Sequence, residues 1–478
     1  MATYTVTEAG PSSASKGIEL QALPCSGTSP ERKIGTSDIE GIRQNIDTPA
    51  RAFEVKQKWN SPGGNKWRVF ATFWSFFVVG MNDGSYGALI PHLELYYDLN
   101  YTVVSLIFLS PFAGYSLASV VNNLIHVRFG QRGVAVMGPL CHLASYTVVA
   151  VHPPYPVLVV MFIFVGFGNG LIDAAWCAWL GNMANANEVQ GILQASYSLG
   201  ATVSPLIATA LVEKTSLDWY GFYYIMEISI ANRDKIAASA VEFVTSASTF
   251  WKQTGAAYEA ENPRDPDSKT GRTREALRSK VTWLFCFFVF GYVGAEVSLG
   301  GWIITFMSRV RGANPIASSA TSTAFWAGMT VGRLLLPLFT ARFGEYPSVI
   351  AYLMLSSGLE LIFWLVPNLV VSAVAVSLLG MFMGPMFPTA IVMVTKLLPK
   401  DLHVGCIGFG TAFGGSGGAI FPFIVGAIAQ SKGVKTLQPV ILALLAAITV
   451  LWALMPRPRG KGHEGQCGDG GESSPIEL

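Results

Sequence analysis

Long apolar runs occupy most of the chain between residues 67 and 456. Each run carries few charges, and about 20 consecutive apolar residues are enough for a helix to cross a bilayer. The pattern therefore predicts twelve membrane-spanning helices. We expect them at residues 67–95, 102–126, 132–152, 155–181, 189–212, 218–251, 281–308, 316–341, 346–366, 369–396, 403–430 and 436–456.

Polar segments divide these runs into two sets of six. A tail at 1–66 precedes the first half at 67–251, a linker at 252–280 leads to the second half at 281–456, and a second tail covers 457–478. The tails and the linker are rich in Ser, Gly, Pro and charge, which is typical of disordered or solvated segments. The predicted fold class is an all-α polytopic membrane protein with two pseudo-symmetric six-helix halves.

The sixth run is interrupted at residues 227–239, which read EISIANRDKIAAS. Each charge in this stretch would cost about 2.5–3.5 kcal/mol at the centre of a bilayer. Removing the stretch would join residues 218–226 to 240–251 and leave one span of 21 residues. The pattern favours the hypothesis that the stretch is a splicing or gene-model product that abolishes activity. The alternative is an irregular span whose charges lie at its cytoplasmic end.

Composition excludes most soluble classes of protein. Hydrophobic residues make up 51% of the chain, charged residues make up 13%, and mean hydropathy is +0.43. Soluble domains carry about 25% charged residues. A net charge of +2 gives no reason to expect nucleic-acid binding, and the six cysteines lack metal-ligand spacing. We find no nucleophile system and no ATP-binding motif, so we expect neither an enzyme nor a cofactor nor a metal.

Lys and Arg residues in the loops predict the orientation of the chain in the membrane. With the N-terminus inside, nineteen of them flank the inner ends of the spans, and five lie in outer loops. Since cytoplasmic loops are enriched in these residues, both termini and the linker are expected in the cytoplasm. We favour the plasma membrane over the vacuolar or another internal membrane. Asn100, in Asn-Tyr-Thr, is a glycosylation candidate in the first outer loop, but we do not expect efficient glycosylation because the loop is short and close to the bilayer.

The two halves share landmarks at one offset. The tripeptide Arg-Phe-Gly at 128–130 recurs at 342–344, which is 214 residues later, and Asp83 maps within one residue of Glu296. The same offset relates three glycine pairs, Gly166 with Gly380, Gly170 with Gly384, and Gly191 with Gly405. Together these matches indicate a duplicated six-helix unit.

Two aspartates lie inside predicted spans, where ionisable residues are costly and usually functional. Asp83 lies in GMNDGSYGALIP and Asp173 in GNGLIDAAW, both among glycines. Burial disfavours a charged carboxyl group and proton binding neutralises it, so Asp83 is suited to carry a proton during transport. The alternative is that each aspartate only accepts hydrogen bonds from neighbouring helices and never titrates.

Five further residues are candidates for binding a polar solute. Glu296, with Trp302 six residues later, could hold a polyol or a cation, because the acid accepts hydroxyl hydrogens and the ring covers a C–H face. Gln194 and Tyr197 are neutral candidates for the same cavity, and Asn82 is another. Ordinary hydrogen bonds between helices remain the alternative for all of them.

The remaining intramembrane polar groups have less support from the sequence. Arg333 lies alone in its span and is expected to be a structural or gating partner of a carboxylate. Glu242 and Glu360 have no motif around them, so helix packing is the default interpretation. His142 is interpreted as a core histidine rather than a proton relay.

The chain resembles the major facilitator superfamily, and within it the fucose–proton symporter branch and its fungal relatives. The resemblance covers residues 67–456, and the matching stretches, in order, are GMNDGSYGALIP, GFGNGLIDAAW, QASYSLGA, YVGAEVSLGGW, VGRLLLPLFTARFG, MGPMFPTAI and GFGTAFGGSGGAIFP. It implies a monomeric transporter for a small polar solute such as a monosaccharide, working by alternating access. It also implies proton coupling through Asp83 and Asp173. An exporter of a secondary metabolite or drug-like compound, or a non-transporting membrane sensor, remains an alternative.

Overall fold

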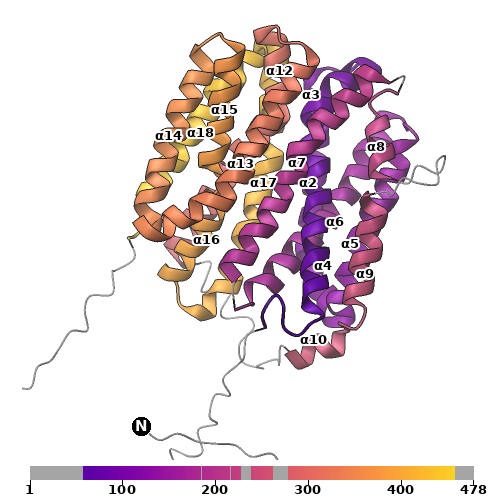
Figure 1. Ribbon diagram of the computed structural model, residues 1–478, viewed down its shortest axis with the longest axis vertical. Helices are drawn as coiled ribbons and strands as arrows, with labels where there is room; N and C mark the ends of the chain where they lie inside the picture. Colours follow the sequence, from indigo (N-terminus) through magenta and orange to yellow (C-terminus); the bar gives the residue numbers. More distant parts are fainter. Residues whose placement is uncertain (1–56, 185, 216, 228–237, 262–277, 458–478) are drawn as a thin grey trace, which may run out of the picture. The chain divides into compact units, whose positions relative to one another are not determined.

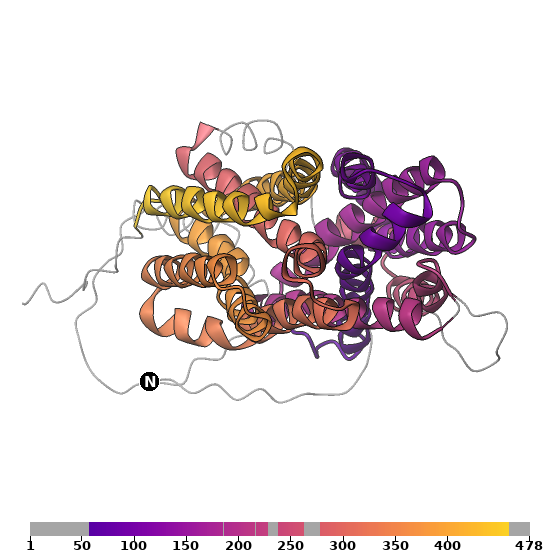
Figure 2. The same cartoon turned by 90° about the horizontal axis from the view of Figure 1, so that it is seen from above.

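The computed structural model of the protein describes residues 57–457 except 185, 216, 228–237 and 262–277. Most of the two predicted tails lies outside these residues. Apart from one isolated bridge between Lys58 and Ser61, the described secondary structure is helical. Figure 2 shows the helices end-on, with those of the first half and those of the second half in two neighbouring groups.

The helices follow the hydrophobic runs closely (Figure 1). The first half holds α2 (Asn65–Tyr96), α3 (Tyr101–Val104), α4 (Leu106–Phe129), α5 (Gln131–Ala150), α6 (Tyr155–Gly181), α7 (Ala186–Lys214), α8 (Gly221–Met226) and α9 (Ala238–Phe250). The second half holds α12 (Lys280–Arg311), α13 (Pro315–Phe343), α14 (Glu345–Leu365), α15 (Leu369–Met383), α16 (Met386–Leu397), α17 (Lys400–Lys432), the short η1 (Val434–Thr436) and α18 (Leu437–Ala453).

The predicted all-α membrane fold is confirmed. Each of the twelve expected spans contains at least one helix, and ten of the described helical segments are long and apolar enough to cross a membrane. The two other spans are α2 and the pair α8–α9. Helix α2 has 32 residues, but Asn82 and Asp83 in its interior lower its hydropathy. Helices α8 and α9 have only 6 and 13 residues.

The sixth span is built from two helices whose ends meet. Helix α8 ends at Met226 and α9 begins at Ala238, and most of the predicted interruption at 227–239 lies outside the described residues. The Ser239 hydroxyl donates to the Met226 carbonyl oxygen at 2.8 Å and to Glu227 Oε1 at 2.7 Å. Residues that are 13 apart in sequence are therefore held together, and the two short helices can serve as one span.

Part of the linker is ordered against the first half. The sequence predicts a solvated connector at 252–280, whereas Gly255–Glu261 forms helix α10, which packs on α4 and α5. The Arg132 backbone N–H donates to the Gln253 carbonyl oxygen at 3.0 Å, and the ring of Tyr258 lies 5.3 Å from that of His126. The start of the linker is thus fixed to the turn between α4 and α5.

The two halves are in close contact at one end of the bundle. We call the end at which α2 and α12 finish the outer end, following the predicted topology, and the opposite end the inner end. At the outer end the Tyr101 N–H donates to Gln430 Oε1 at 2.8 Å, and Arg309 lies 3.9 Å from Glu94. Residues 84–90 of α2 and 298–307 of α12 are buried throughout. The outer end is therefore closed.

Helices α7 and α13 connect the halves along most of their length, as Figure 1 also shows. The hydroxyls of Thr209 and Ser319 are hydrogen-bonded towards the outer end. At mid-height the Thr323 hydroxyl donates to the Thr202 carbonyl oxygen at 2.9 Å. Because residue numbers rise on α7 as they fall on α13, the two helices run antiparallel.

Glycines bring α2 and α7 into backbone contact. A Cβ atom at Gly80 would clash with the carbonyl oxygen of Tyr197, and a Cβ atom at Gly200 would clash with that of Phe77. Small residues allow helices in a membrane to approach closely, which is a main source of their packing energy. The close approach also fixes the height of Tyr197 relative to α2.

We predict that Gly80→Ala destabilises the protein while Gly358→Ala does not. The added methyl group at Gly80 meets backbone rather than a movable side chain, and overpacking of this kind costs about 1–3 kcal/mol. Gly358 lies in α14 with open space around its Cβ position, and Ala is the better helix former. Thermal unfolding of the two purified variants in detergent measures the difference. Equal melting temperatures would contradict the packing argument.

Candidate functional site

Asp83 lies near the middle of α2 and accepts a hydrogen bond from α7. The Tyr197 hydroxyl donates to Asp83 Oδ2 at 3.1 Å, and Asn82 Nδ2 donates to Asp83 Oδ1 at 3.2 Å. Asn82 Nδ2 also donates to the hydroxyl of Tyr86 at 2.6 Å. Asn82 is fully buried, whereas Asp83 and Tyr197 are partly exposed. The carboxylate is thus held by one phenol and one amide in a residue that is partly exposed.

Asp173 has the same kind of environment on α6. The Tyr115 hydroxyl, from α4, donates to Asp173 Oδ2 at 3.0 Å, and both side chains are partly exposed. Helices α4 and α6 approach as closely as α2 and α7, because a Cβ atom at Gly114 would clash with the carbonyl oxygen of Ile163. Tyr115 is not among the site residues predicted from the sequence, where its only signal is its position one residue after a glycine.

Arg333 and Glu296 form an ion pair within the second half. Arg333 Nη2 on α13 lies 2.9 Å from Glu296 Oε1 on α12, and both residues are 4% exposed. Arg333 Nη1 also donates to the Gln194 carbonyl oxygen on α7 at 3.2 Å, across the contact between the halves. The structure thus joins two residues with different predicted roles, a structural or gating arginine and a solute-binding glutamate.

Tyr197 links the two groups of charged residues. Its hydroxyl binds Asp83, and its ring centroid lies 5.8 Å from the Arg333 guanidinium carbon. An arginine at this distance from an aromatic ring is attracted by the ring electrons. A continuous series of contacts therefore runs from Asp83 through Tyr197 and Arg333 to Glu296, and it crosses between the two halves.

The other predicted site residues are more dispersed. Trp302 is fully buried in the closed outer end, where its indole N–H donates to the Pro422 carbonyl oxygen at 3.0 Å and its ring lies 6.3 Å from that of Phe108. Six residues of helix, a rise of about 9 Å, separate it from Glu296 on α12. The Gln194 side chain is partly exposed beside Tyr197 on α7. Asn100 is exposed and caps α3.

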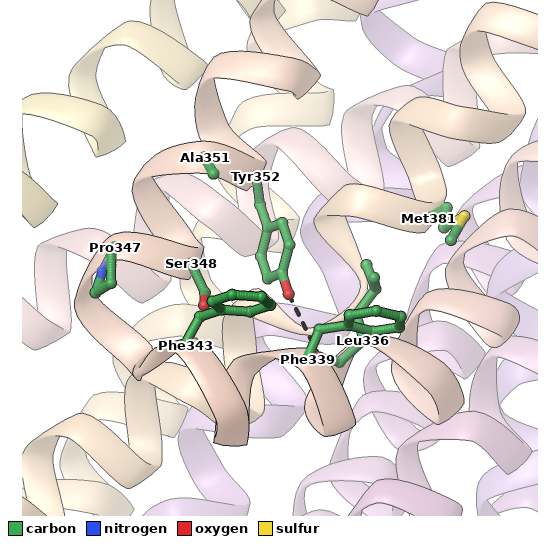
Figure 3. Close-up of a pocket in the computed structure, with 8 residues that line it drawn as sticks. All are labelled: Leu336, Phe339, Phe343, Pro347, Ser348, Ala351, Tyr352 and Met381. Carbon is green, nitrogen blue, oxygen red and sulfur yellow. Dashed lines mark hydrogen bonds between the residues drawn. The ribbon is translucent and has the colours of Figure 1, made fainter.

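A pocket between α13, α14 and α15 has different chemistry (Figure 3). It has a volume of about 380 Å³, and its lining residues are Leu336, Phe339, Phe343, Pro347, Ser348, Ala351, Tyr352 and Met381. Phe339 and Phe343 are 55% and 67% exposed, and the Tyr352 hydroxyl donates to the Leu336 carbonyl oxygen at 3.4 Å. An apolar depression with exposed phenylalanines suits a lipid-facing surface better than a site for a polar solute.

We predict that Glu296→Gln destabilises the protein more than Arg333→Gln. Breaking a buried ion pair costs about 3–5 kcal/mol, because one charge is left unpaired. The glutamate left by Arg333→Gln can take up a proton, whereas the arginine left by Glu296→Gln stays charged. The double variant should cost less than the sum of the two single changes. Unfolding titrations of the four proteins in mixed micelles test this cycle, and additive costs would contradict it.

Comparisons with known proteins agree with the fold. A family model described as Major Facilitator Superfamily matches residues 72–402. Bypass of stop codon protein 6 of Saccharomyces cerevisiae is 31% identical over 422 residues, which cover 84% of this chain and 84% of that protein. A glucose/galactose transporter of Brucella abortus is 27% identical over 384 residues, which cover 76% of this chain and 88% of that protein.

The fold also matches solved structures. A crystal structure of the E. coli fucose:proton symporter matches with a TM-score of 0.56 at 14% identity, over 81% of this chain and 98% of that one. A second structure of that transporter, titled as the outward conformation, gives the same TM-score at 15% identity. The helical fold, the family match and the yeast relative together identify the chain as a multi-pass membrane transporter of the major facilitator superfamily.

Proposed function

We propose that the protein is a proton-coupled transporter for a monosaccharide or a similar polar solute, which binds between the two halves. The observation that carries this proposal is the pair Asp83 and Asp173. Each aspartate lies inside a membrane span, is partly exposed, and is held by one tyrosine hydroxyl. At that depth a carboxyl group is far costlier in contact with lipid than with water. We therefore infer that both aspartates face an aqueous path.

The two aspartates are suited to carry protons because their partners are weak ones. One phenol at Asp173, or one phenol and one amide at Asp83, offset only part of the cost of burying a carboxylate. Binding a proton removes the charge, so each group can be charged while it is open to water and neutral while it is enclosed. Glu296, by contrast, has Arg333 as a permanent counter-charge. We accordingly assign proton coupling to Asp83 and Asp173.

A sugar fits the polar groups near these aspartates. Asn82, Gln194 and Tyr197 supply both hydrogen-bond donors and acceptors, which a ring of hydroxyl groups can match. The glucose/galactose transporter of Brucella abortus, to which the chain is 27% identical, supports this solute class. Trp302 is sealed in the closed outer end, so its predicted contact with the solute would form only in a state that opens there.

Alternating access would require the outer contacts to separate. The contacts Glu94–Arg309 and Tyr101–Gln430 both join the two halves and are polar and exposed at the rim, so they are inexpensive to break. On the inner side, the bond from Arg333 to the Gln194 carbonyl oxygen and its contact with the Tyr197 ring also cross between the halves. We assign Arg333 a gating role on this basis.

We propose that the transporter acts as a monomer with both termini in the cytoplasm. The excess of Lys and Arg at the predicted inner ends supports this orientation. Under it, the exposed Asn100 lies in an outer loop, where a glycan could be attached. The plasma membrane remains our preferred location.

We predict that Asp83→Asn abolishes accumulation driven by a pH gradient but leaves exchange measurable. Asparagine keeps the size and the hydrogen bond of the side chain and cannot bind a proton. Uptake of radiolabelled D-glucose, D-galactose and L-fucose into proteoliposomes, with and without a pH gradient, measures accumulation. Exchange of the same sugars at equal pH on both sides measures movement without coupling.

The matched control is Glu360→Gln, which removes another buried carboxyl group, on α14 in the second half. This variant should accumulate sugar as the wild type does. If Asp83→Asn also concentrates sugar as well as the wild type, the assignment of coupling to Asp83 is wrong. If the wild-type protein moves none of the three sugars under any gradient, the proposed solute class fails.

A further inference from the structure

His142 and Glu242 form a buried pair that the proposed transport site does not use. His142 lies on α5 and Glu242 on α9, and the imidazole Nδ1 is 3.0 Å from the carboxylate Oε2. Neither side chain has any exposed surface. The sequence predicts helix packing for Glu242, which has no motif around it, and a core position for His142. Their direct contact inside the first half therefore calls for another explanation.

The pair lies among buried polar atoms that lack partners. Within the described residues, Glu242 Oε1 and the Tyr146 hydroxyl have no hydrogen-bond partner. Asn169, on α6, is a hydrogen-bonding neighbour of the His142 side chain. Nearly all buried polar atoms in proteins are satisfied, because each unsatisfied one is costly. A pair kept only for packing would be expected to satisfy these atoms. A side chain that gains and loses a proton cannot have all its polar atoms hydrogen-bonded equally well in its protonated and deprotonated states.

Residues of α5 and α6 fit closely around the imidazole ring. The Tyr146 ring stacks on it at a centroid distance of 5.7 Å, and a Cβ atom at Gly168 on α6 would lie 2.9 Å from His142 Nε2. The glycine therefore leaves the space that the ring nitrogen occupies. This fit keeps Nδ1 directed at Glu242 and Nε2 directed at α6.

The groups around the pair are acidic or phenolic. The charges on Asp83 and Asp173 are near enough to act on His142. The other titratable groups around it are Tyr146 on α5, Tyr223 on α8, whose ring lies 5.8 Å from that of Tyr146, and Glu227 after α8, which accepts a bond from Thr147 on α5. The pair is neutral overall when it holds one proton and carries a full negative charge when it loses that proton. Losing the proton therefore adds a charge to a region that already contains several acids.

We propose that His142 and Glu242 together form a second proton-binding site, which holds one proton between Nδ1 and Oε2 and is separate from the Asp83–Asp173 site. When the proton leaves, the imidazole becomes neutral, Glu242 remains a carboxylate, and the pair changes from zero to one negative charge. Because charges on His142 and Asp83 interact, protonation of one site changes proton binding at the other. Any coupling of this second site to transport rests on the proposed function, whereas proton binding by the pair does not.

The test measures proton binding directly and needs no substrate. Purified full-length protein in lipid nanodiscs is titrated from about pH 4 to about pH 10, a range that covers the ordinary titration of carboxyl and imidazole groups. Infrared difference spectra follow the carboxyl and imidazole bands. Wild type is compared with Glu242→Gln, His142→Gln and the double variant. Glu360→Gln is the matched control, since Glu360 is equally buried and lacks a hydrogen-bond partner among the described residues.

A shared proton gives a non-additive result. Either single variant should remove the same titration step, and the double variant should remove nothing further. Glu360→Gln should change a different band, which His142→Gln leaves unaltered. If the spectra of the wild type and the three pair variants titrate identically, the pair binds no exchangeable proton and the proposal falls. If the two single variants remove independent steps, the proton is not shared and the proposal also falls.

Folding of each variant is checked by thermal unfolding before titration. Glu242→Gln preserves the shape of the side chain, so it provides the decisive comparison if His142→Gln does not fold. Failure of this inference is distinguishable from failure of the proposed function. A titration step at the pair without sugar accumulation would leave the second site intact and refute the transport proposal. Sugar accumulation that depends on Asp83, without a titration step at the pair, would support the transport proposal and refute the second proton-binding site.

Discussion

A carboxyl group inside a membrane needs a cation, a hydrogen-bond donor or a proton to offset its lost hydration. The acids in the described spans differ in which of these they have. Glu296 has an arginine at 2.9 Å, Glu242 has an imidazole at 3.0 Å, and Asp83 and Asp173 have only uncharged donors, which are a tyrosine hydroxyl for each and the Asn82 amide for Asp83. The strength of the partner decreases along this series. Among these four acids, the two aspartates therefore depend most on water or on a proton.

Backbone contact between helices makes these pairings possible. A tyrosine on a neighbouring helix reaches a mid-span aspartate only when the two helices lie close and at a fixed height. Gly80 and Gly200 set this geometry for Asp83, and Gly114 does so for Asp173. The same arrangement thus occurs twice in the first half. In the second half the ion pair of Glu296 with Arg333 takes its place, so the halves share a helical plan but differ in their chemistry.

The hydrophobic pattern predicted the fold well because span length and helix periodicity are local properties. Most expected spans agree with the helices to within a few residues, and Asp83 and Asp173 stood out as polar residues in apolar segments. Their hydrogen-bond partners could not be predicted in this way, because a pairing such as Tyr115 with Asp173 depends on how two helices pack. Helix α10 was missed for a similar reason, since its composition is that of a linker and its order comes from contact with α4 and α5.

Tyr197 shows how proton binding in one half could change the contacts with the other half. Its hydroxyl donates to Asp83, and its ring lies beneath the guanidinium of Arg333. A hydrogen bond to a carboxylate is about twice as strong as one between neutral groups. Protonation of Asp83 would therefore weaken the bond that holds Tyr197 on the side of α2. The Tyr197 side chain, which belongs to α7, would then be held mainly by its contact with Arg333. A change of one proton at Asp83 would therefore alter the contacts where the two halves meet.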